Sequence, residues 1–291
     1  MSTSLHTFLL TGAAMLAFAA NSLLCRLALE QPRIDPASFG SIRLASGALV
    51  LAVVVRFRAD RERPPPADWL AAATLFAYVA FFSFAYLRLP AGTGALILFG
   101  AVQLTMLGAG LRAGERFAPA AWAGLSTALA GLIYLVSPGI AAPAPTGAAL
   151  MAAAGVAWGV YSLRGRGVSD PLGATAANFA RAVPFALALN LAGASGVRLD
   201  AGGVALAIAS GAVSSGLGYA IWYAALRGLT AMRAATVQLS VPPIAAVGGA
   251  WLLAEPVTWR LLLSSAAILG GIGTVLAVRD GARAVIRRSV R

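Results

Sequence analysis

The sequence predicts an all-α integral membrane protein with ten transmembrane helices, arranged as two inverted five-helix repeats (5+5). The first observation is composition: of 291 residues, 59% are hydrophobic and only 11% are charged. Soluble domains carry roughly 25% charged residues, so a soluble core could not enclose this much apolar surface. The second is a series of apolar runs of membrane-spanning length, and the third is a repeat of landmark residues after about 140 positions.

The apolar runs account for almost the whole chain. A spanning helix needs about 20 mostly apolar residues. The runs of this kind are 7–29, 36–56, 68–87, 91–111, 118–136, 146–164, 171–192, 201–226, 230–253 and 258–278. The gaps are short and rich in turn residues, as at Pro64-Pro65-Pro66, Ser137-Pro138-Gly139 and Asp170-Pro171. No gap is long enough for a soluble domain.

The first run also resembles a signal peptide, because Ala17-Phe18-Ala19 has the small-residue pattern of a cleavage site. No arginine or lysine precedes it, so the positive region of a signal peptide is missing. We expect the run to stay in the protein as the first span, with cleavage as the alternative.

The basic residues, all 22 of them arginine, lie mostly in the short gaps and the tail. This placement is typical of a membrane protein, so we expect no nucleic-acid partner despite the net charge of +12. With the N-terminus inside, fourteen arginines face the inner side, and five face the outer side: Arg26, Arg33, Arg88, Arg198 and Arg260. The positive-inside rule therefore predicts a bacterial inner (plasma) membrane protein with both termini cytoplasmic.

The tail from Arg279 to Arg291 is predicted to lie against anionic lipid headgroups. A simple stop-transfer anchor is the alternative. The single cysteine, Cys25, excludes an intrachain disulfide, and the single histidine, His6, is too isolated to form a metal site. We expect no metal and no cofactor.

An internal repeat divides the chain into residues 1–139 (spans one to five) and 140–291 (spans six to ten and the tail). The matching landmarks are Arg26 with Arg164, Arg43 with Arg181, Leu87-Arg88 with Leu226-Arg227, Glu115 with Glu255, and Gly131 with Gly271, at offsets of 138 to 140. Because five spans is an odd number, the second half enters the membrane upside down. Inverted repeats are typical of secondary transporters; a duplicated helix bundle without transport is the alternative.

In each repeat the fourth span ends in small and apolar residues followed by a glutamate, and a glycine-rich fifth span comes next. In the first repeat these segments are Gly108 to Glu115 and Gly124 to Gly131; in the second they are Gly249 to Glu255 and Gly270 to Gly273. At these residues the sequence resembles the drug/metabolite transporter superfamily, in particular its ten-helix EamA-type members. The resemblance implies a metabolite transporter with a central cavity. The stretch from Leu96 to Thr105 also resembles aromatic amino acid exporters of this superfamily.

The sequence departs from the family pattern at two places. The pattern's proline thirteen residues before the glutamate is Pro242 in the second repeat, whereas the first has Val102, which leaves that helix straight. The pattern's Trp-Gly is Trp158-Gly159 in the second repeat but Ala20-Asn21 in the first.

Polar and aromatic side chains within spans are the candidates for binding the solute, because placing polar groups in the membrane costs free energy and a functional role explains that cost. The predicted substrate-binding residues are Asn21, Tyr78, Phe82, Phe99, Gln103, Trp158, Ser162, Ser215, Tyr219, Trp222 and Gln238. They lie in spans one, three, four, six, eight and nine, which the family resemblance implies as the cavity lining. For each aromatic the alternative is a lipid-facing or interfacial ring, and Trp222, near a helix end, is the most open to it.

Pro242 and Pro243 are predicted to form a hinge in span nine. Neither proline can donate a backbone hydrogen bond, so the carbonyls of Gln238 and Leu239 lose their helical donors at mid-membrane depth. Such carbonyls need protein, water or solute to satisfy them, and a substrate ammonium is one candidate. A purely structural kink is the alternative, and it is the interpretation for Pro184.

No Asp, Glu or His lies in the middle of a span, which argues against a proton-coupled antiporter for cationic drugs. Arg43 and Arg181 are the charges well within spans. We expect them to snorkel or to pair, with carboxylate or phosphate binding as the alternative.

The predicted function is export of small neutral or zwitterionic metabolites, above all amino acids with large apolar side chains, by uncoupled or weakly coupled alternating access. The predicted partners are this solute and membrane lipids, and a monomer is sufficient. A proton-coupled multidrug or other metabolite exporter and a lipid flippase remain alternatives. A membrane-embedded enzyme would need His, Asp or Lys clustered near one interface, which the sequence lacks.

Overall fold

The computed structural model describes residues 3–31, 33–58, 67–114, 118–166, 168–193, 196–229 and 231–289. Glu115, one of the repeat landmarks, and the turn Pro64-Pro65-Pro66 lie outside these ranges, as do the arginine side chains of the predicted tail. Within the ranges all regular elements are helices, apart from one isolated antiparallel bridge between Ile34 and Leu199.

The first half contains five helices that follow the predicted spans closely. They are α1 (Thr3–Glu30), α2 (Pro36–Phe57), α3 (Trp69–Ala85), α4 (Ala91–Arg112) and α5 (Pro119–Val136). α4 is unbroken through Val102, where the proline of the family pattern is missing.

The second half has the same plan, but two of its spans are interrupted. Its elements are α6 (Pro145–Arg164), α7 (Pro171–Ala192), α8 (Ala201–Ile208), the π-helix η2 (Ala209–Leu217), α9 (Gly218–Leu226), α10 (Ala231–Gln238), α11 (Val241–Leu252) and α12 (Trp259–Ser289). α8, η2 and α9 together form the eighth span, and α10 with α11 forms the ninth. In the described part of the chain, nine stretches are long and apolar enough to cross a membrane, and α3 is a shorter apolar helix of 17 residues. The protein is therefore a multi-pass membrane protein.

Four aspartates fix the starts of the second and third spans of each half. Asp35 and Asp68 accept hydrogen bonds from the backbone N–H groups of Ser38 and Ala71, each at 2.9 Å. Asp170 caps α7 through Gly173 N–H at 2.9 Å, and Asp200 caps α8. Each cap satisfies a donor that has no partner within the helix, so these residues set where the helices begin.

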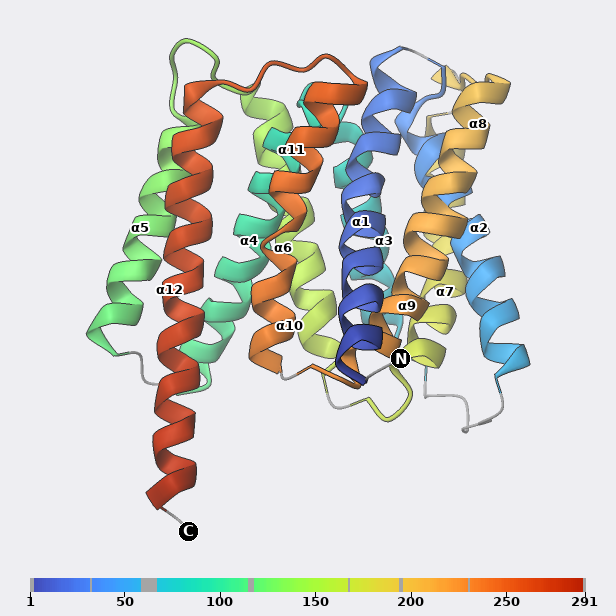
Figure 1. The fold of residues 1–291 in the computed structure, drawn as a ribbon. Helices are drawn as coiled ribbons and strands as arrows, with labels where there is room; N and C mark the ends of the chain where they lie inside the picture. The colour runs from blue at the N-terminus through green and yellow to red at the C-terminus, as the bar shows by residue number, and fades with distance from the viewer. Residues whose placement is uncertain are drawn as a thin grey trace.

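The two halves are inverted and interleaved (Figure 1). α1 starts at the end of the molecule that holds both termini, whereas α6 starts at the opposite end. The closest packing joins helices of different halves: α2 with α7, α3 with α6, α4 with α6 and α11, and α5 with α12. The interface between the halves therefore forms the centre of the protein.

Small residues allow this close packing. A Cβ atom on Gly155 of α6 would lie 2.6 Å from the Cβ of Ala101 on α4. A Cβ on Gly211 of η2 would collide with the carbonyl of Arg43 on α2. These glycines are needed because the helix backbones approach each other at these points.

The interruptions of spans eight and nine have different origins. η2 is a π-helical stretch rich in Ser, Gly and Ala that packs against α2 and was not predicted. Span nine breaks at Leu239 and Ser240, and the prolines Pro242 and Pro243 then lie in the first turn of α11, where a missing N–H costs little. A hinge motion at this break remains a prediction. α7 continues through Pro184.

Candidate functional site

A cavity of about 650 Å³ lies between the two halves. Its lining reaches the start of α3 at Asp68, the end of α6 at Arg164 and the start of α7 at Pro171. These segments lie at the end of the molecule that holds both termini (Figure 1). The cavity is therefore open toward the face of the termini.

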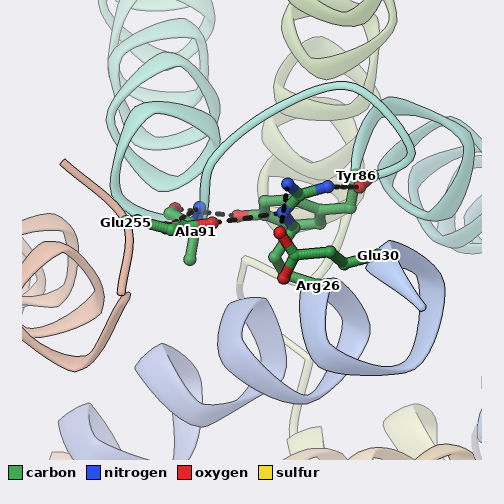
Figure 2. A network of polar contacts seen from close by, with 5 residues as sticks. All are labelled: Arg26, Glu30, Tyr86, Ala91 and Glu255. Carbon is green, nitrogen blue, oxygen red and sulfur yellow. Dashed lines mark hydrogen bonds and ion pairs between the residues drawn. The ribbon is translucent and has the colours of Figure 1, made fainter. Parts of the chain in front are cut away.

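At the opposite end, where α1 ends and α4 begins, a polar network surrounds Arg26 (Figure 2). None of its residues lines the cavity, so we take this end as closed. The Arg26 guanidinium donates to Glu255 Oε1 at 3.1 Å, to the carbonyl of Tyr86 at 3.1 Å and to Glu30 at 3.1 Å. The second oxygen of Glu255 accepts a 2.7 Å hydrogen bond from the N–H of Ala91, at the start of α4. One guanidinium thus joins α1, the α3–α4 connection and, through Glu255, the segment before α12.

A second set of contacts joins the halves at the same end. The N–H of Asp35 donates to the carbonyl of Arg198 at 3.1 Å, and the N–H of Asp200 donates to the carbonyl of Arg33 at 2.8 Å.

Within the Arg26 network, burial raises the pKa of the Glu255 carboxyl above its ordinary value, whereas the hydrogen bonds from Ala91 and Arg26 act in the opposite direction. The carboxyl is thus partly shielded from water.

Nine aromatic residues of the described chain line the cavity, and Trp158 lies among three of the others. Its ring centroid lies 4.8 Å from that of Tyr78, 5.3 Å from Tyr161 and 5.6 Å from Tyr219. Tyr78 belongs to the first half and the other rings to the second. The cluster offers flat apolar faces and hydroxyl groups to a bound molecule.

The polar groups of the lining are amides and hydroxyls, together with Arg181 and, at the mouth, Asp68, Arg164 and Arg166. Asn21 Oδ1 accepts a 2.8 Å hydrogen bond from Ser210. Nearer the mouth, the hydroxyls of Thr175 and Tyr223 are 2.9 Å apart, and Tyr161 donates to Thr175 at 3.4 Å. Among the described lining residues the one acid is Asp68, at the mouth, where it pairs with Arg164 at 2.9 Å.

Nine of the eleven predicted binding residues line the cavity. They are Asn21, Tyr78, Phe82, Phe99, Trp158, Ser162, Tyr219, Trp222 and Gln238. The lipid-facing alternative for Trp222 is wrong, because this side chain is only 7% exposed and contacts Phe18.

Gln103 and Ser215 do not line the cavity. Gln103 is buried in α4, outside the lining. Ser215 is fully buried in η2, where it accepts from Arg43 and lies 3.5 Å from the amide oxygen of Asn21. Ser215 therefore supports lining residues from behind.

Sequence reasoning missed several lining residues: Phe18, Tyr161, Thr175, Asn178, Arg181 and Tyr223. Tyr161 and Tyr223 follow Trp158 and Tyr219 by three and four positions, a spacing that places them on the same helix faces. Thr175 and Asn178 lie on α7, a span from which no lining residue was predicted.

The expectation that Arg43 snorkels or pairs with an acid is wrong. Its side chain is buried, with the residue only 1% exposed, and it bonds to neutral hydroxyls: Nε to Ser215 at 3.2 Å and Nη2 to Tyr78 at 3.0 Å. Its guanidinium carbon also lies 4.9 Å from the ring centroid of Phe82. α2 places Arg43 on its buried face.

Beside the mouth, Arg58 and Asp170 form two parallel hydrogen bonds of 2.6 Å that join α2 to α7. The Arg58 guanidinium holds the pKa of the Asp170 carboxyl below its ordinary value. No cluster of three His, Cys, Asp or Glu side chains that could hold a metal ion occurs among the described residues.

Three comparisons relate the chain to known proteins. A model of the EamA-like transporter family matches twice, at residues 6–137 and 145–277. An uncharacterized protein of Pseudomonas aeruginosa is 55% identical over 276 residues, covering 95% of this chain and 96% of its own. A protein crystal structure superposes with a TM-score of 0.67 at 20% identity, over 94% of this chain and 98% of that one. This last likeness concerns the fold alone.

Proposed function

The chain belongs to the EamA-like transporter family, and we propose that it carries a small zwitterionic solute, an amino acid with a large apolar side chain, across a bacterial inner membrane. Members of this family are transporters rather than enzymes. The proposed mechanism is alternating access, in which the two inverted halves expose one central site to each side in turn.

One observation carries this proposal: a solute-sized cavity lies between inverted halves, open at one end and closed by the Arg26–Glu255 network at the other. A passage that is open at both ends would be a channel, and a filled interior would bind nothing. A cavity closed at one end is what one state of an alternating-access carrier requires.

The cavity lining supports the proposed solute class. The volume of the cavity lies within the range of roughly 300–1,000 Å³ that is usual for small-molecule sites. The rings around Trp158 suit an apolar or aromatic side chain, and the amides of Asn21 and Gln238 suit a polar backbone group. The nine predicted lining residues are proposed to make these contacts.

The proposed transport is uncoupled export down a concentration gradient. Proton coupling through a carboxylate would need an acid within the spans, and the acid of the described lining, Asp68, is at the mouth. The excess of arginine on the face of the termini supports a cytoplasmic location for that face, so the open cavity is proposed to face the cytoplasm.

Counterflow in proteoliposomes tests the function. With no membrane potential and no pH gradient, labelled phenylalanine or methionine should enter vesicles preloaded with the unlabelled amino acid. Transport that requires a proton gradient, or no counterflow of any amino acid in a panel that includes threonine, would contradict the proposal.

Trp158→Ala tests the site. Removal of the central ring should slow phenylalanine counterflow at least about tenfold, because stacking and burial worth roughly 1.5 kcal/mol or more are lost. The matched control is Trp251→Ala, since Trp251 is 84% exposed on the outside of the bundle. Gln238→Ala should lower transport as well. Equal rates for Trp158→Ala and Trp251→Ala would exclude the aromatic cluster as the site.

A further inference from the structure

Arg43 is a buried cation whose contacts include no carboxylate in the described part of the chain. Its hydrogen-bond partners are the hydroxyls of Ser215 and Tyr78, and the remaining nitrogen, Nη1, is buried without a hydrogen-bond partner. An arginine stays charged in proteins, and a buried charge is costly unless it is paired and hydrogen-bonded. This state of the protein therefore leaves a charge unneutralised inside the bundle.

Arg43 lies directly behind the cavity wall. The rings of Tyr78 and Phe82, over which its guanidinium carbon sits at 5.3 Å and 4.9 Å from the centroids, are both lining residues. Ser215, which accepts from Arg43 Nε, also lies 3.5 Å from Asn21, a third lining residue. One layer of side chains separates this charge from the cavity.

Arg181 holds the corresponding position in the second half, 138 residues later. It is half-buried and lines the cavity, on the same face of α7 as Ala174, Thr175 and Asn178. Among the described residues it makes no hydrogen bond and no ion pair. It lies ten residues from the start of α7, about 15 Å from the mouth along the helix, so its guanidinium is available to a solute that has entered.

The two arginines are placed at similar depth from opposite ends. α7 starts at the mouth, whereas α2 starts at the closed end, seven residues before Arg43. In an inverted repeat the two states exchange the environments of equivalent residues. Opening the other end should therefore expose Arg43 and bury Arg181.

We propose that the cavity recognises the carboxylate of its solute through these two repeat-related arginines, Arg181 in the state open toward the termini and Arg43 in the opposite state. The inference rests on the proposed function and extends its substrate class from zwitterionic amino acids to other monocarboxylates with an apolar body. A guanidinium binds a carboxylate through two parallel charge-assisted hydrogen bonds. The other two arginines of the described lining, Arg164 and Arg166, lie at the end of α6, at the mouth. At its own depth the Arg181 guanidinium matches one negative charge, and a phosphate dianion would remain half neutralised there.

Binding to the purified full-length protein in detergent tests the carboxylate site. The probes are 3-phenylpropionate and its neutral amide, 3-phenylpropanamide, followed by tryptophan fluorescence, since Trp158 and Trp222 line the cavity. The carboxylate should bind at least about tenfold more tightly, the scale of a charge-assisted pair. Arg181→Gln should remove this preference, whereas Arg112→Gln, an exposed arginine outside the cavity lining, should keep it.

Equal affinities of the two probes for the wild-type protein, or an unchanged preference in Arg181→Gln, would overturn the inference. The result also separates it from the proposed function. If carboxylate preference depends on Arg181 but no amino acid undergoes counterflow, the transport proposal fails and the carboxylate site stands. If counterflow occurs without the preference, the carboxylate site fails alone.

Arg43 is tested by the same two measurements. Arg43→Gln should keep the preference of at least about tenfold for 3-phenylpropionate over its amide in detergent, although the loss of the contacts to Tyr78 and Phe82 weakens the binding of both probes. Phenylalanine counterflow should fall at least about tenfold, because the Arg43 charge is needed in the opposite state. Arg43→Lys, which keeps the charge, should retain part of the counterflow. This variant still tests the role of the charge if Arg43→Gln does not fold. Counterflow at the wild-type rate in Arg43→Gln would exclude the proposal that Arg43 binds the carboxylate in the opposite state.

Discussion

Arg26 and Arg164 occupy equivalent positions in the two halves, yet their surroundings differ. The Arg26 side chain is 15% exposed and bonds to Glu255, Glu30 and the carbonyl of Tyr86. The Arg164 side chain is 40% exposed and pairs with Asp68 at the rim of the cavity. Arg26 thus draws several segments together at one end, whereas Arg164 stands beside an opening at the other.

The repeat places an arginine at the end of the first helix in each half. In the proposed alternating-access mechanism, the state of the protein decides whether that arginine is enclosed or exposed. Arg43 and Arg181 differ in the same way, with the enclosed member again in the first half. If the proposed mechanism holds, the asymmetry between the two ends of the protein is a property of this state, and mutations can test it.

The largest effect is expected for Glu255→Gln at the closed end. The change removes the negative charge that faces Arg26 in a site where the Glu255 side chain is 9% exposed, at an expected cost of about 2–3 kcal/mol to the closed arrangement. A cysteine placed at Leu98, which lines the cavity, should then react with an impermeant maleimide from that side at least about tenfold faster.

The control for this experiment is Glu30→Gln. Glu30 also pairs with Arg26, but its side chain is 39% exposed, and exposed pairs contribute about 0–1 kcal/mol. Labelling at Leu98→Cys should change little in this background. Equal labelling in both backgrounds would show that Glu255 does not hold the closed end.

A second test compares the two ends of one helix. A Cβ atom on Gly92, in the first turn of α4, would lie 2.7 Å from the Cα of Ala246 on α11. Gly92→Ala must separate the two helices at the closed end, at a cost of about 1–3 kcal/mol. A Cβ on Gly108, near the other end of α4, would meet no atom within 4 Å, so Gly108→Ala should stabilise by about 0.5–1 kcal/mol. Melting temperatures in detergent should move in opposite directions, and shifts of the same sign would contradict the packing described for α4.

The smallest effect concerns pH at the open end. Because the Arg58 guanidinium lowers the pKa of the Asp170 carboxyl from its ordinary 3.8, the pair stabilises the folded state fully above that value. This contribution disappears as the pH falls through the lowered pKa. Unfolding measured from pH 6 to pH 3 should show less acid-dependent loss in Asp170→Asn, which keeps an N-cap but has no charge to lose. A variant that loses as much stability as wild type would assign the acid sensitivity to other groups.

Most of the fold follows from hydropathy. The predicted run 171–192 coincides with α7, and the other runs end within a few residues of their helices, apart from α12, which continues to Ser289. The π-helix η2 was not predictable, because its hydrogen-bond register depends on close packing against α2, including the contact of Gly211 with the backbone of Arg43.

The candidate site was predicted less completely, because helix periodicity does not show how far along a face the cavity extends. Phe99 and Gln103 share one face of α4, but Phe99 lines the cavity whereas Gln103 is buried outside the lining. Arg43 was expected to snorkel or to pair, because the sequence alone does not show that Tyr78 and Ser215, from distant segments, enclose it.

η2 also sets the direction in which the residues after it point. Each residue turns an α-helix by about 100°, so the wider turns of a π-helix change the angular position of everything that follows. Tyr219 and Trp222 lie in the first turns of α9, directly after η2, and both line the cavity. If this stretch became a regular α-helix, the aromatic face of α9 would rotate about the helix axis and away from the cavity. Deletion of one residue from 209–217 would likewise turn both rings away, although no residue of the cavity lining is replaced.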